Sequence, residues 1–322
     1  MSNIQAPHFH DPDKAREYLE AIRWPDGPVC PHCGSTEGAY ALKGKAHRPG
    51  LYKCAACRKQ FSVTVGTVFE RSKVGLDKWL LAAYLLCSSK KGISSHQLHR
   101  TLGVTYKTAW FMAHRIREAM REEGGSPMGG PGRIVEVDEV YIGGKRRRPP
   151  QTASSKRKLV PGDKKAAKRW GSYGQDKKKV ITLVERGGRV RSVHVPNVTS
   201  RIVKDEIRRQ LHPDTILMTD EAPYYTMVGR EMGGHHTVNH SMGEYVRGSV
   251  YTNTVEGYFS ILKRGLNGIY QHVSRQHLKR YVGEYDFRYN HRALTDAERA
   301  DEALRGIEGK RLQYRQPVAQ GS

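Results

Sequence analysis

The most informative alternating pattern covers residues 133–144, RIVEVDEVYIGG, where β-branched and aromatic residues end in glycines. This composition is typical of a β-strand. With a period of two, Glu136 and Asp138 share one face of the strand and Glu139 lies on the other. Apolar residues occupy both faces, and a carboxylate on a buried face must be protonated, paired or bound to metal. An edge strand with solvated acids is the alternative, so the interpretation depends on whether other acids join Asp138.

The pattern after this strand predicts further strands and helices. Residues 180–184 and 190–195 indicate a hairpin across a Gly-Gly turn, and residues 215–219 indicate a short strand that ends at Asp220. A strand is also expected at residues 236–239. Helices are expected at residues 200–211, 224–232, 252–266, 276–292 and 296–314.

The order strand, strand, strand, helix, strand matches a ribonuclease-H-like sheet, in which the first and fourth strands are adjacent. Asp138 and Asp220 would then meet at one edge of the sheet. Glu256 lies on a later helix, with 35 residues between it and Asp220. Converging carboxylates suit Mg²⁺, which takes oxygen ligands and keeps several waters, and Mn²⁺ is the other candidate. Two such ions stabilise the attacking and leaving oxygens when a phosphodiester is displaced.

Two N-terminal helices are predicted around a tight turn at Gly103, one at residues 93–102 and one at residues 105–120. This is the layout of a helix-turn-helix. A plain helical hairpin of a bundle has the same pattern. The second helix carries the basic residues that we expect to contact DNA: Lys107, His114, Arg115 and Arg117.

Other N-terminal segments have clear local signals. Residues 11–24 predict a helix with Asp11 as its N-cap, and residues 60–69 have strand character. Apolar residues recur at three- and four-residue steps over residues 76–87, which predicts another helix. Cys87, on the apolar side of that helix, is expected in the core.

The other four cysteines form two CxxC pairs with 20 residues between the pairs. Two such pairs are the ligand set of a structural tetrahedral zinc site, because both thiolates of a pair can face one ion. Reduced cysteines that only pack in a core are the alternative, and a redox pair fits less well because there are two pairs. His32 and His47 are spare candidates, which we expect at the surface or facing DNA. The predicted zinc ligands are Cys30, Cys33, Cys54 and Cys57.

The charge balance indicates a polyanionic partner. The 322 residues include 55 Lys and Arg against 32 Asp and Glu, a net charge of +23, and nucleic acid is the leading candidate. The basic residues are densest at residues 145–179, where we expect a mobile solvated loop that still neutralises phosphates. A membrane surface is the competing partner, but no apolar run of about 18 residues supports it. The first residues lack an apolar signal segment, so we expect the chain in the cytoplasm, where paired cysteines indicate metal.

Several short motifs are specific when taken together. They are RWPDG and CPHCG within residues 23–34, CRKQFSVTVGTVF at 57–69, KTAWFMAHRIR at 107–117, VDEVYIGGK at 137–145, TDE at 219–221, NTVEGYFSILKRG at 253–265 and YNHR at 289–292. With these motifs the chain resembles the DDE transposases of bacterial insertion sequences, in particular the zinc-ribbon group often called ISXO-like. The resemblance covers nearly the whole chain.

The resemblance implies metal-dependent cleavage at transposon ends and joining to target DNA by the 3′-hydroxyl, with Asp138 and Asp220 as ligands. Some members of the group use an asparagine in the third acidic position, which makes Asn253 a candidate beside Glu256. Lys263 lies seven residues after Glu256 and hence on the same helix face, where a cation can hold a terminal phosphate. A solvated helix lysine is the alternative. The implied partners are the element's terminal inverted repeats and target DNA, bound by a homo-oligomer at the bacterial nucleoid.

The predicted fold class is α/β, with a ribonuclease-H-like catalytic domain preceded by a small zinc ribbon and a helix-turn-helix. A Gly- and Pro-rich linker at residues 122–132 marks a domain boundary. The predicted domains are residues 1–70 (N-terminal helix and zinc ribbon), 71–124 (helix-turn-helix region) and 125–322 (catalytic domain with the basic insertion and a C-terminal helical tail).

Two other functions compete with a transposase. One is a zinc-ribbon and helix-turn-helix DNA-binding regulator, or an inactive transposase remnant, and the three intact acids argue against it. The other is a structure-selective nuclease on the same fold, which would cut DNA without joining it.

Overall fold

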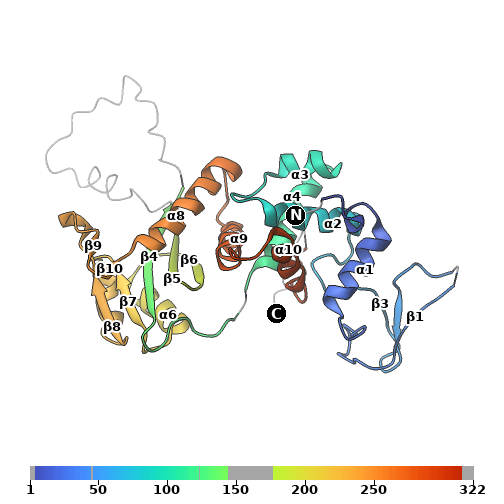
Figure 1. The fold of residues 1–322 in the computed structure, drawn as a ribbon, viewed down its shortest axis with the longest axis horizontal. Helices are drawn as coiled ribbons and strands as arrows, with labels where there is room; N and C mark the ends of the chain where they lie inside the picture. The colour runs from blue at the N-terminus through green and yellow to red at the C-terminus, as the bar shows by residue number, and fades with distance from the viewer. Residues whose placement is uncertain (1–3, 45, 123, 144–176, 314–322) are drawn as a thin grey trace, which may run out of the picture. The chain divides into compact units, whose positions relative to one another are not determined.

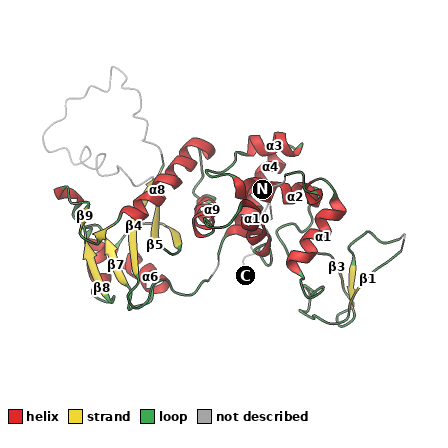
Figure 2. Ribbon diagram, in the orientation of Figure 1, coloured by secondary structure: helices red, strands yellow, loops and turns green. Residues whose placement is uncertain are grey.

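The computed structural model describes residues 4–44, 46–122, 124–143 and 177–313. The chain forms two compact units (Figure 1). Unit 1 contains Met1–Gly125 and Arg264–Ser322, and unit 2 contains Ser126–Lys263. Unit 1 is mainly helical and unit 2 holds the larger sheet, as Figure 2 shows. The basic run predicted at residues 145–179 lies outside the described residues except for its last three positions.

The start of the first α-helix of unit 1 is set by one side chain. Asp11 accepts hydrogen bonds from the amides of Asp13 and Lys14 at 2.8 and 3.1 Å, which confirms it as the N-cap of α1. The strand expected at residues 60–69 is much shorter, because the chain turns after Phe61. The first elements are η1 (Pro7–Phe9), α1 (Pro12–Arg23) and the antiparallel strands β1 (Ala39–Ala41), β2 (Tyr52–Cys54) and β3 (Gln60–Phe61).

The next three helices agree with the apolar periodicity of the sequence. The Ser94 hydroxyl accepts a hydrogen bond from the Gln97 amide at 3.2 Å and so caps α3. The Thr105 hydroxyl accepts one from the Thr108 amide at 3.3 Å and so caps α4. Gly103 ends α3 in the left-handed region with φ of 61°. Cys87 is buried in the core, as predicted. The helices are α2 (Leu76–Ser88), α3 (Ser95–Leu102) and α4 (Tyr106–Met120).

The C-terminal helices pack within unit 1, α9 against α4 and α10 against α2. Arg117 of α4 donates to Glu284 of α9 at 2.6 Å, and both side chains are buried. Arg288 donates to the same carboxylate, also at 2.6 Å. The structure therefore groups these helices with the N-terminal ones, whereas the sequence-based division put them in the catalytic domain. The elements are the π-helix η5 (Leu266–Tyr270), α9 (Leu278–Asn290) and α10 (Asp296–Arg305).

Unit 2 is built on a five-stranded sheet of order β6-β5-β4-β7-β8. β5 pairs antiparallel with β4 and β6, whereas β7 pairs parallel with β4 and β8. The predicted adjacency of the first and fourth strands is therefore confirmed. The strands are β4 (Ile134–Ile142), β5 (Lys178–Glu185), β6 (Val190–Val195), β7 (Ile216–Thr219) and β8 (Gly234–Thr237).

The two faces of this sheet carry different chemistry. Val135 and Val137 of β4 lie in an apolar core with Val203 and Ile207 of α6 (Ser200–Gln210). Side chains alternate along a strand, so the residues between and after these valines point to the opposite face. The opposite face therefore carries Glu136 and Asp138 beside the buried side chains of Val140, Val180 and Val184.

Helix α8 (Asn253–Gly265) packs on this second face. The hydroxyl of Thr182 in β5 donates to Ser192 in β6 at 3.0 Å, and Ser192 donates to the hydroxyl of Tyr258 in α8 at 3.2 Å. Asp138 is the β4 partner of Thr182 and hence belongs to the same row across the sheet. The sheet therefore holds α8 on the face that carries the predicted catalytic acid.

The helices and strands between β7 and α8 are all short. The helix predicted at residues 224–232 consists of the 3-10 helix η3 (Pro223–Tyr225) and the short α7 (Thr226–Gly229). A small hairpin of β9 and β10 was not expected from the sequence pattern. These later elements are η4 (His240–Met242), β9 (Val246–Arg247) and β10 (Val250–Tyr251).

Breaking the buried ion pair of unit 1 is expected to destabilise the protein. Glu284→Gln leaves Arg117 and Arg288 beside a neutral side chain, and removing one partner of a buried pair costs about 3–5 kcal/mol. Glu302→Gln is the matched control, because Glu302 pairs with Arg305 at the surface, where a pair contributes about 0–1 kcal/mol. Urea denaturation followed by tryptophan fluorescence compares the variants with the wild type. Equal stability of both variants would contradict this prediction.

Candidate functional site

The four predicted zinc ligands lie together in unit 1. Their sulfur atoms all fall within 4.8 Å of one another. The Sγ atoms of Cys30 and Cys57 are 3.6 Å apart and those of Cys33 and Cys54 are 3.7 Å apart. A tetrahedron with Zn–S bonds of ~2.3 Å has edges of ~3.8 Å. The cluster therefore has the size and the donor chemistry of a structural zinc site.

Both CxxC segments turn in the same way. The amide of Gly34 donates to the carbonyl of Cys30, and the amide of Arg58 donates to the carbonyl of Cys54, each at 2.9 Å. Gly34 and Arg58 have positive φ angles of 73° and 60°. Glycine adopts this conformation readily, whereas an arginine there is strained. The second turn is therefore maintained by its surroundings, and a zinc ion on Cys54 and Cys57 would supply one such interaction.

Electrostatics favour a thiolate at Cys30. Burial by itself raises the pKa of this thiol, but hydrogen bonds from the amides of His32 and Cys33 and from the thiols of Cys33 and Cys57 lower the pKa to about 6. The thiolate is the form that binds metal. His32 Nε2 lies 3.2 Å from the carbonyl oxygen of Gln60, and both His32 and His47 are exposed. Neither histidine belongs to the sulfur cluster.

The acids predicted to bind Mg²⁺ lie in unit 2. In the parallel pair of β4 and β7, Glu136 is opposite Met218. Asp138 lies two residues after Glu136, and Asp220 lies two residues after Met218. The two aspartates are therefore at corresponding positions on neighbouring segments of the chain. Glu256 lies in the first turn of α8, which runs beside these strands in Figure 1. The structure therefore brings all three acids to one region of the sheet.

Burial and mutual repulsion perturb this group. Burial raises the pKa of Asp138 to about 7, with contributions from the carboxylates of Glu139, Asp220 and Glu256. Burial also raises the pKa of Asp220, although Asp220 Oδ1 accepts a hydrogen bond from the amide of Ala222 at 3.1 Å. Carboxylates in this situation are stabilised by a nearby positive charge. A bound cation would supply it.

The three carboxylates are neighbours that do not converge tightly. Among the described residues, the cysteines are the group whose ligand atoms all lie within 4.8 Å of one another, and the acids form no such group. Asn253 and Lys263 lie on the same helix as Glu256, at its start and near its end. All three of these helix residues are exposed. The helix thus presents them to solvent, with Asn253 and Glu256 both in its first turn.

Two residues beside Glu256 had no signal in the sequence. His240 Nε2 lies 3.6 Å from Glu256 Oε1, and the Thr252 hydroxyl donates to the same oxygen at 3.3 Å. His240 also lowers the pKa of Asp220, against the larger effect of burial. His240 lies in a 3-10 helix between β8 and β9, so only the tertiary fold brings it to the acids.

Glu139 has a structural role on the other side of β4. It accepts hydrogen bonds from the hydroxyls of Tyr224 and Tyr225, the latter at 2.9 Å. Burial, the largest effect, raises the pKa of Glu139, and the tyrosine hydrogen bonds oppose it. The two tyrosines belong to η3, the first helical turn after Asp220. Glu139 therefore ties the segment after Asp220 to the strand that carries Asp138.

Of the four residues of α4 predicted to contact DNA, Lys107 is exposed. His114, Arg115 and Arg117 are 1%, 7% and 1% exposed. Arg115 donates to two backbone carbonyls at 3.2 and 2.8 Å, and Arg117 pairs with Glu284. Arg115 and Arg117 therefore bond within unit 1, and His114 is buried there against the rings of Trp110 and Tyr281, which corrects the expectation that these three side chains reach DNA. Periodicity alone did not separate the solvent face of α4 from its buried faces.

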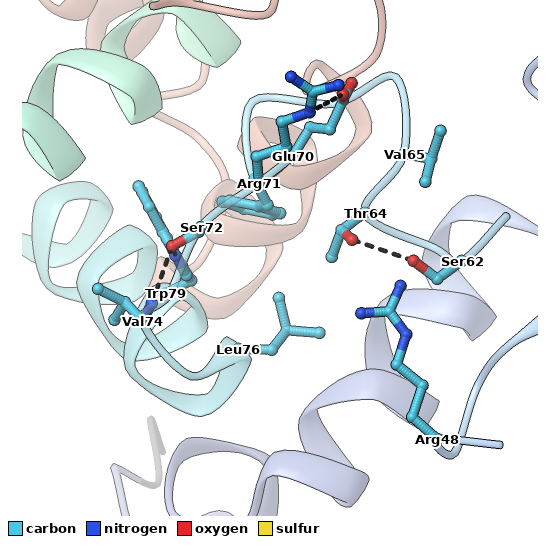
Figure 3. A pocket seen from close by; sticks show the side chains of 11 residues that line it. Arg48, Ser62, Thr64, Val65, Glu70, Arg71, Ser72, Val74, Leu76 and Trp79 are labelled. Atoms are coloured by element: carbon cyan, nitrogen blue, oxygen red, sulfur yellow. Dashed lines mark hydrogen bonds and ion pairs between the residues drawn. The ribbon is translucent and has the colours of Figure 1, made fainter. Parts of the chain in front are cut away.

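A cavity of about 290 Å³ lies beside the loop that precedes α2 (Figure 3). Trp79 Nε1 donates to the hydroxyl of Ser72 at 2.9 Å, and Arg71 Nε lies 3.7 Å from Glu70 Oε1. Its lining, all within the described part of the chain, includes none of the predicted zinc ligands or acids. The cavity is therefore separate from both candidate metal sites.

Two segments match known protein families. Residues 11–60 match a transposase zinc-ribbon domain, and residues 129–290, half of the chain, match the ISXO2-like transposase domain. The chain belongs to the ISXO2-like transposase family. An uncharacterized protein in transposable element ISH50 of Halobacterium salinarum is 30% identical to this transposase over 283 residues, 85% of this chain and 90% of that protein. An uncharacterized transposase-like protein of Haemophilus influenzae is 28% identical over 102 residues, 32% of this chain and 81% of that protein.

The matches agree with the two candidate sites. The zinc-ribbon match contains all four clustered cysteines, and the transposase-domain match contains β4, β7 and α8 with their acids. This second match also extends beyond unit 2 to the end of α9. Within the described residues of the transposase, no helix is long and apolar enough to cross a membrane.

Cys54→Ser is expected to abolish stable zinc binding. A serine hydroxyl does not replace a thiolate ligand, and the tetrahedral shell then lacks one donor. Cys87→Ala is the control, because Cys87 is buried in α2 and is not part of the cluster. Metal analysis of the purified full chain should find about one zinc ion per chain in the wild type and in the control. Zinc-free wild type, or unchanged zinc in Cys54→Ser, would show this assignment to be wrong.

The raised pKa of Asp138 predicts a pH-dependent stability in Mg²⁺-free buffer. Folding raises this pKa from 3.8 to about 7, so the folded state favours the protonated acid and loses stability as the pH rises through this window. Asp138→Asn cannot ionise. The thermal unfolding temperature of Asp138→Asn relative to wild type should therefore be higher at pH 8 than at pH 5. An equal difference at both pH values would be inconsistent with a raised pKa.

Proposed function

We propose that this ISXO2-like transposase binds the ends of its insertion sequence, cleaves them by metal-dependent phosphodiester hydrolysis and joins the freed 3′-hydroxyl to target DNA. The observation that carries the proposal is the placement of Asp138, Asp220 and Glu256 around β4, β7 and α8 in a chain of a transposase family. The strand order β6-β5-β4-β7-β8 supports a ribonuclease-H-like fold for unit 2.

Asp138, Asp220 and Glu256 are the residues that would hold Mg²⁺ or Mn²⁺. Carboxylate oxygens are the ligands that these hard ions prefer. The three acids, of which Asp138 and Asp220 are partly buried, repel one another without a cation. Their separation suits an ion that keeps several waters. When bound, the metal activates the attacking oxygen and stabilises the leaving oxygen. Asn253 is the other candidate third ligand, since it shares the first turn of α8 with Glu256.

Surface residues of both units are suited to hold DNA. We propose that α3 and α4 form a helix-turn-helix, in which the N-terminal residues of the second helix contact base edges. Tyr106 and Lys107, both exposed, occupy that end of α4. In unit 2, the exposed Lys263 lies two helical turns from Glu256 and would hold a terminal phosphate.

The partners and location follow from the same proposal. The net charge of +23 suits binding to the phosphates of the element's terminal inverted repeats and of the target. Cleavage and joining of two ends would be carried out by a homo-oligomer assembled on that DNA. We place this complex in the cytoplasm, at the nucleoid.

Conservative replacement of each acid is expected to abolish cleavage and joining together while leaving end binding intact. Asp138→Asn, Asp220→Asn and Glu256→Gln remove charge with little change of shape. Each should slow both steps by roughly 100-fold or more, the scale on which one preorganised electrostatic group contributes. The measurement is an assay on labelled element ends with Mg²⁺ and a target plasmid, run beside a binding assay on the same ends.

Glu221→Gln is the matched control, because Glu221 follows Asp220 but is not one of the proposed ligands, and its carboxylate accepts hydrogen bonds from the amides of His240 and Ser241. An Asp220→Asn protein that still cleaves would exclude this site. Activity in Glu256→Gln combined with inactivity in Asn253→Ala would move the third ligand to Asn253. Cutting by the wild type without joining would identify a nuclease instead of a transposase.

A further inference from the structure

Glu136 is a fully buried carboxylate that the proposed chemistry does not use. It lies on β4 two residues before Asp138 and is 0% exposed. Its oxygens accept hydrogen bonds from the Thr254 amide at 2.8 Å, the Val255 amide at 3.0 Å and the Thr254 hydroxyl at 2.8 Å. Arg186 Nε donates to it at 2.6 Å. A buried carboxylate is stable only when it is satisfied in this way.

The helix that Glu136 contacts is the one that carries Glu256. Thr254 and Val255 are in the first turn of α8, where the backbone amides have no acceptor within the helix. Such amides are commonly capped by a neighbouring side chain in the sequence. Here the acceptor comes from a strand more than a hundred residues earlier. Its negative charge also interacts favourably with the positive end of the helix dipole.

Arg186 connects this cap to the other elements of the acid site. Arg186 Nη1 donates to the carbonyl of Ser249 and Nη2 to the carbonyl of Tyr251, each at 2.8 Å. Its guanidinium lies 3.5 Å from the centre of the Tyr251 ring. Nη2 also lies 3.0 Å from the sulfur of Met218. Met218 is in β7, two residues before Asp220. The Glu136–Arg186 pair therefore connects β4, which contains Glu136, with β7 and with the segment that leads into α8.

These contacts oppose a repulsion that the acid site creates. Asp138, Asp220 and Glu256 carry like charges, and bringing α8 against the strands places Glu256 near the other two. The repulsion favours withdrawal of the first turn of α8. The Glu136 cap holds that same turn through two amides and a hydroxyl. A helix held in this way can present Glu256 before any cation neutralises the group.

We propose that Glu136 and Arg186 are positioning residues, which hold the first turn of α8 so that Glu256 meets Asp138 and Asp220 at a divalent metal ion. This inference rests on the proposed function, because it assigns the three acids to one site. Neither Glu136 nor Arg186 contacts the metal or the DNA in this role. Their contribution is the orientation of a ligand, and loss of such a partner lowers metal affinity by roughly 10–100-fold.

Glu136→Gln in the full-length chain tests the proposal. The glutamine keeps the size of the side chain, but its NH₂ group replaces one acceptor for Thr254, Val255 and Arg186. The apparent Mn²⁺ dissociation constant, measured by electron paramagnetic resonance, should rise by roughly 10–100-fold. Hydrogen exchange should become faster at the first-turn amides of α8. Binding to labelled element ends should stay within about twofold of the wild type, since no DNA-contacting group changes.

Glu185→Gln is the matched control. Glu185 is also a largely buried strand glutamate beside an arginine, but its partner is Arg133, at 3.2 Å. It should leave Mn²⁺ affinity and α8 exchange unchanged. If Glu136→Gln does not fold, Thr254→Val carries the test, because it removes only the hydroxyl donor and retains both amides. It should change Mn²⁺ affinity and exchange in the same direction by a smaller factor.

The outcomes separate this inference from the proposed function. Wild-type Mn²⁺ affinity in a folded Glu136→Gln protein, with unchanged exchange in α8, would overturn the positioning role alone. A wild-type protein that binds no Mn²⁺ in unit 2 would overturn the proposed function and the positioning role together. A loss of thermal stability without a change in Mn²⁺ affinity would show that the pair is only structural.

Discussion

The acid site of unit 2 depends on the buried contact between Glu136 and the first turn of α8. Three carboxylates on separate elements repel one another, so the fold must hold them together before a cation arrives. Glu136 does this with hydrogen bonds of 2.8 to 3.0 Å to α8, and Arg186 neutralises the charge of Glu136 while contacting β7. One face of β4 therefore carries both the anchor, Glu136, and, two residues later, the proposed metal ligand Asp138.

Unit 1 uses charged residues for architecture in a similar way. Arg117 lies in a basic segment that suggests DNA contact, yet it pairs with Glu284 inside the helical core. The four clustered cysteines likewise lie on chain segments that have little regular structure, since the strands beside them are only two or three residues long. Net positive charge therefore overstates the number of cations free to bind phosphates, and burial decides which ones remain.

Local signals predicted most of the elements. Asp11, Ser94 and Thr105 cap helices because their side chains bond to amides only a few residues away. The CxxC spacing likewise places the two cysteines of each pair on one tight turn. Strand order also predicted the meeting of β4 and β7. The cap by Glu136, the place of His240 and the burial of Arg117 were not predictable, because each depends on partners distant in sequence. The ligand choice between Glu256 and Asn253 is similar, since both occupy one helical turn.

Anomalous scattering from Mn²⁺ in crystals of the full chain, grown without chelator, tests the central claim most directly. An anomalous peak in unit 2 bound by Asp138, Asp220 and Glu256, with Glu136 still on the amides of α8, is the predicted result. A Mn²⁺ peak in unit 2 that is held by other residues would contradict it. So would the absence of a Mn²⁺ peak near Asp138 and Asp220 in crystals grown with excess Mn²⁺.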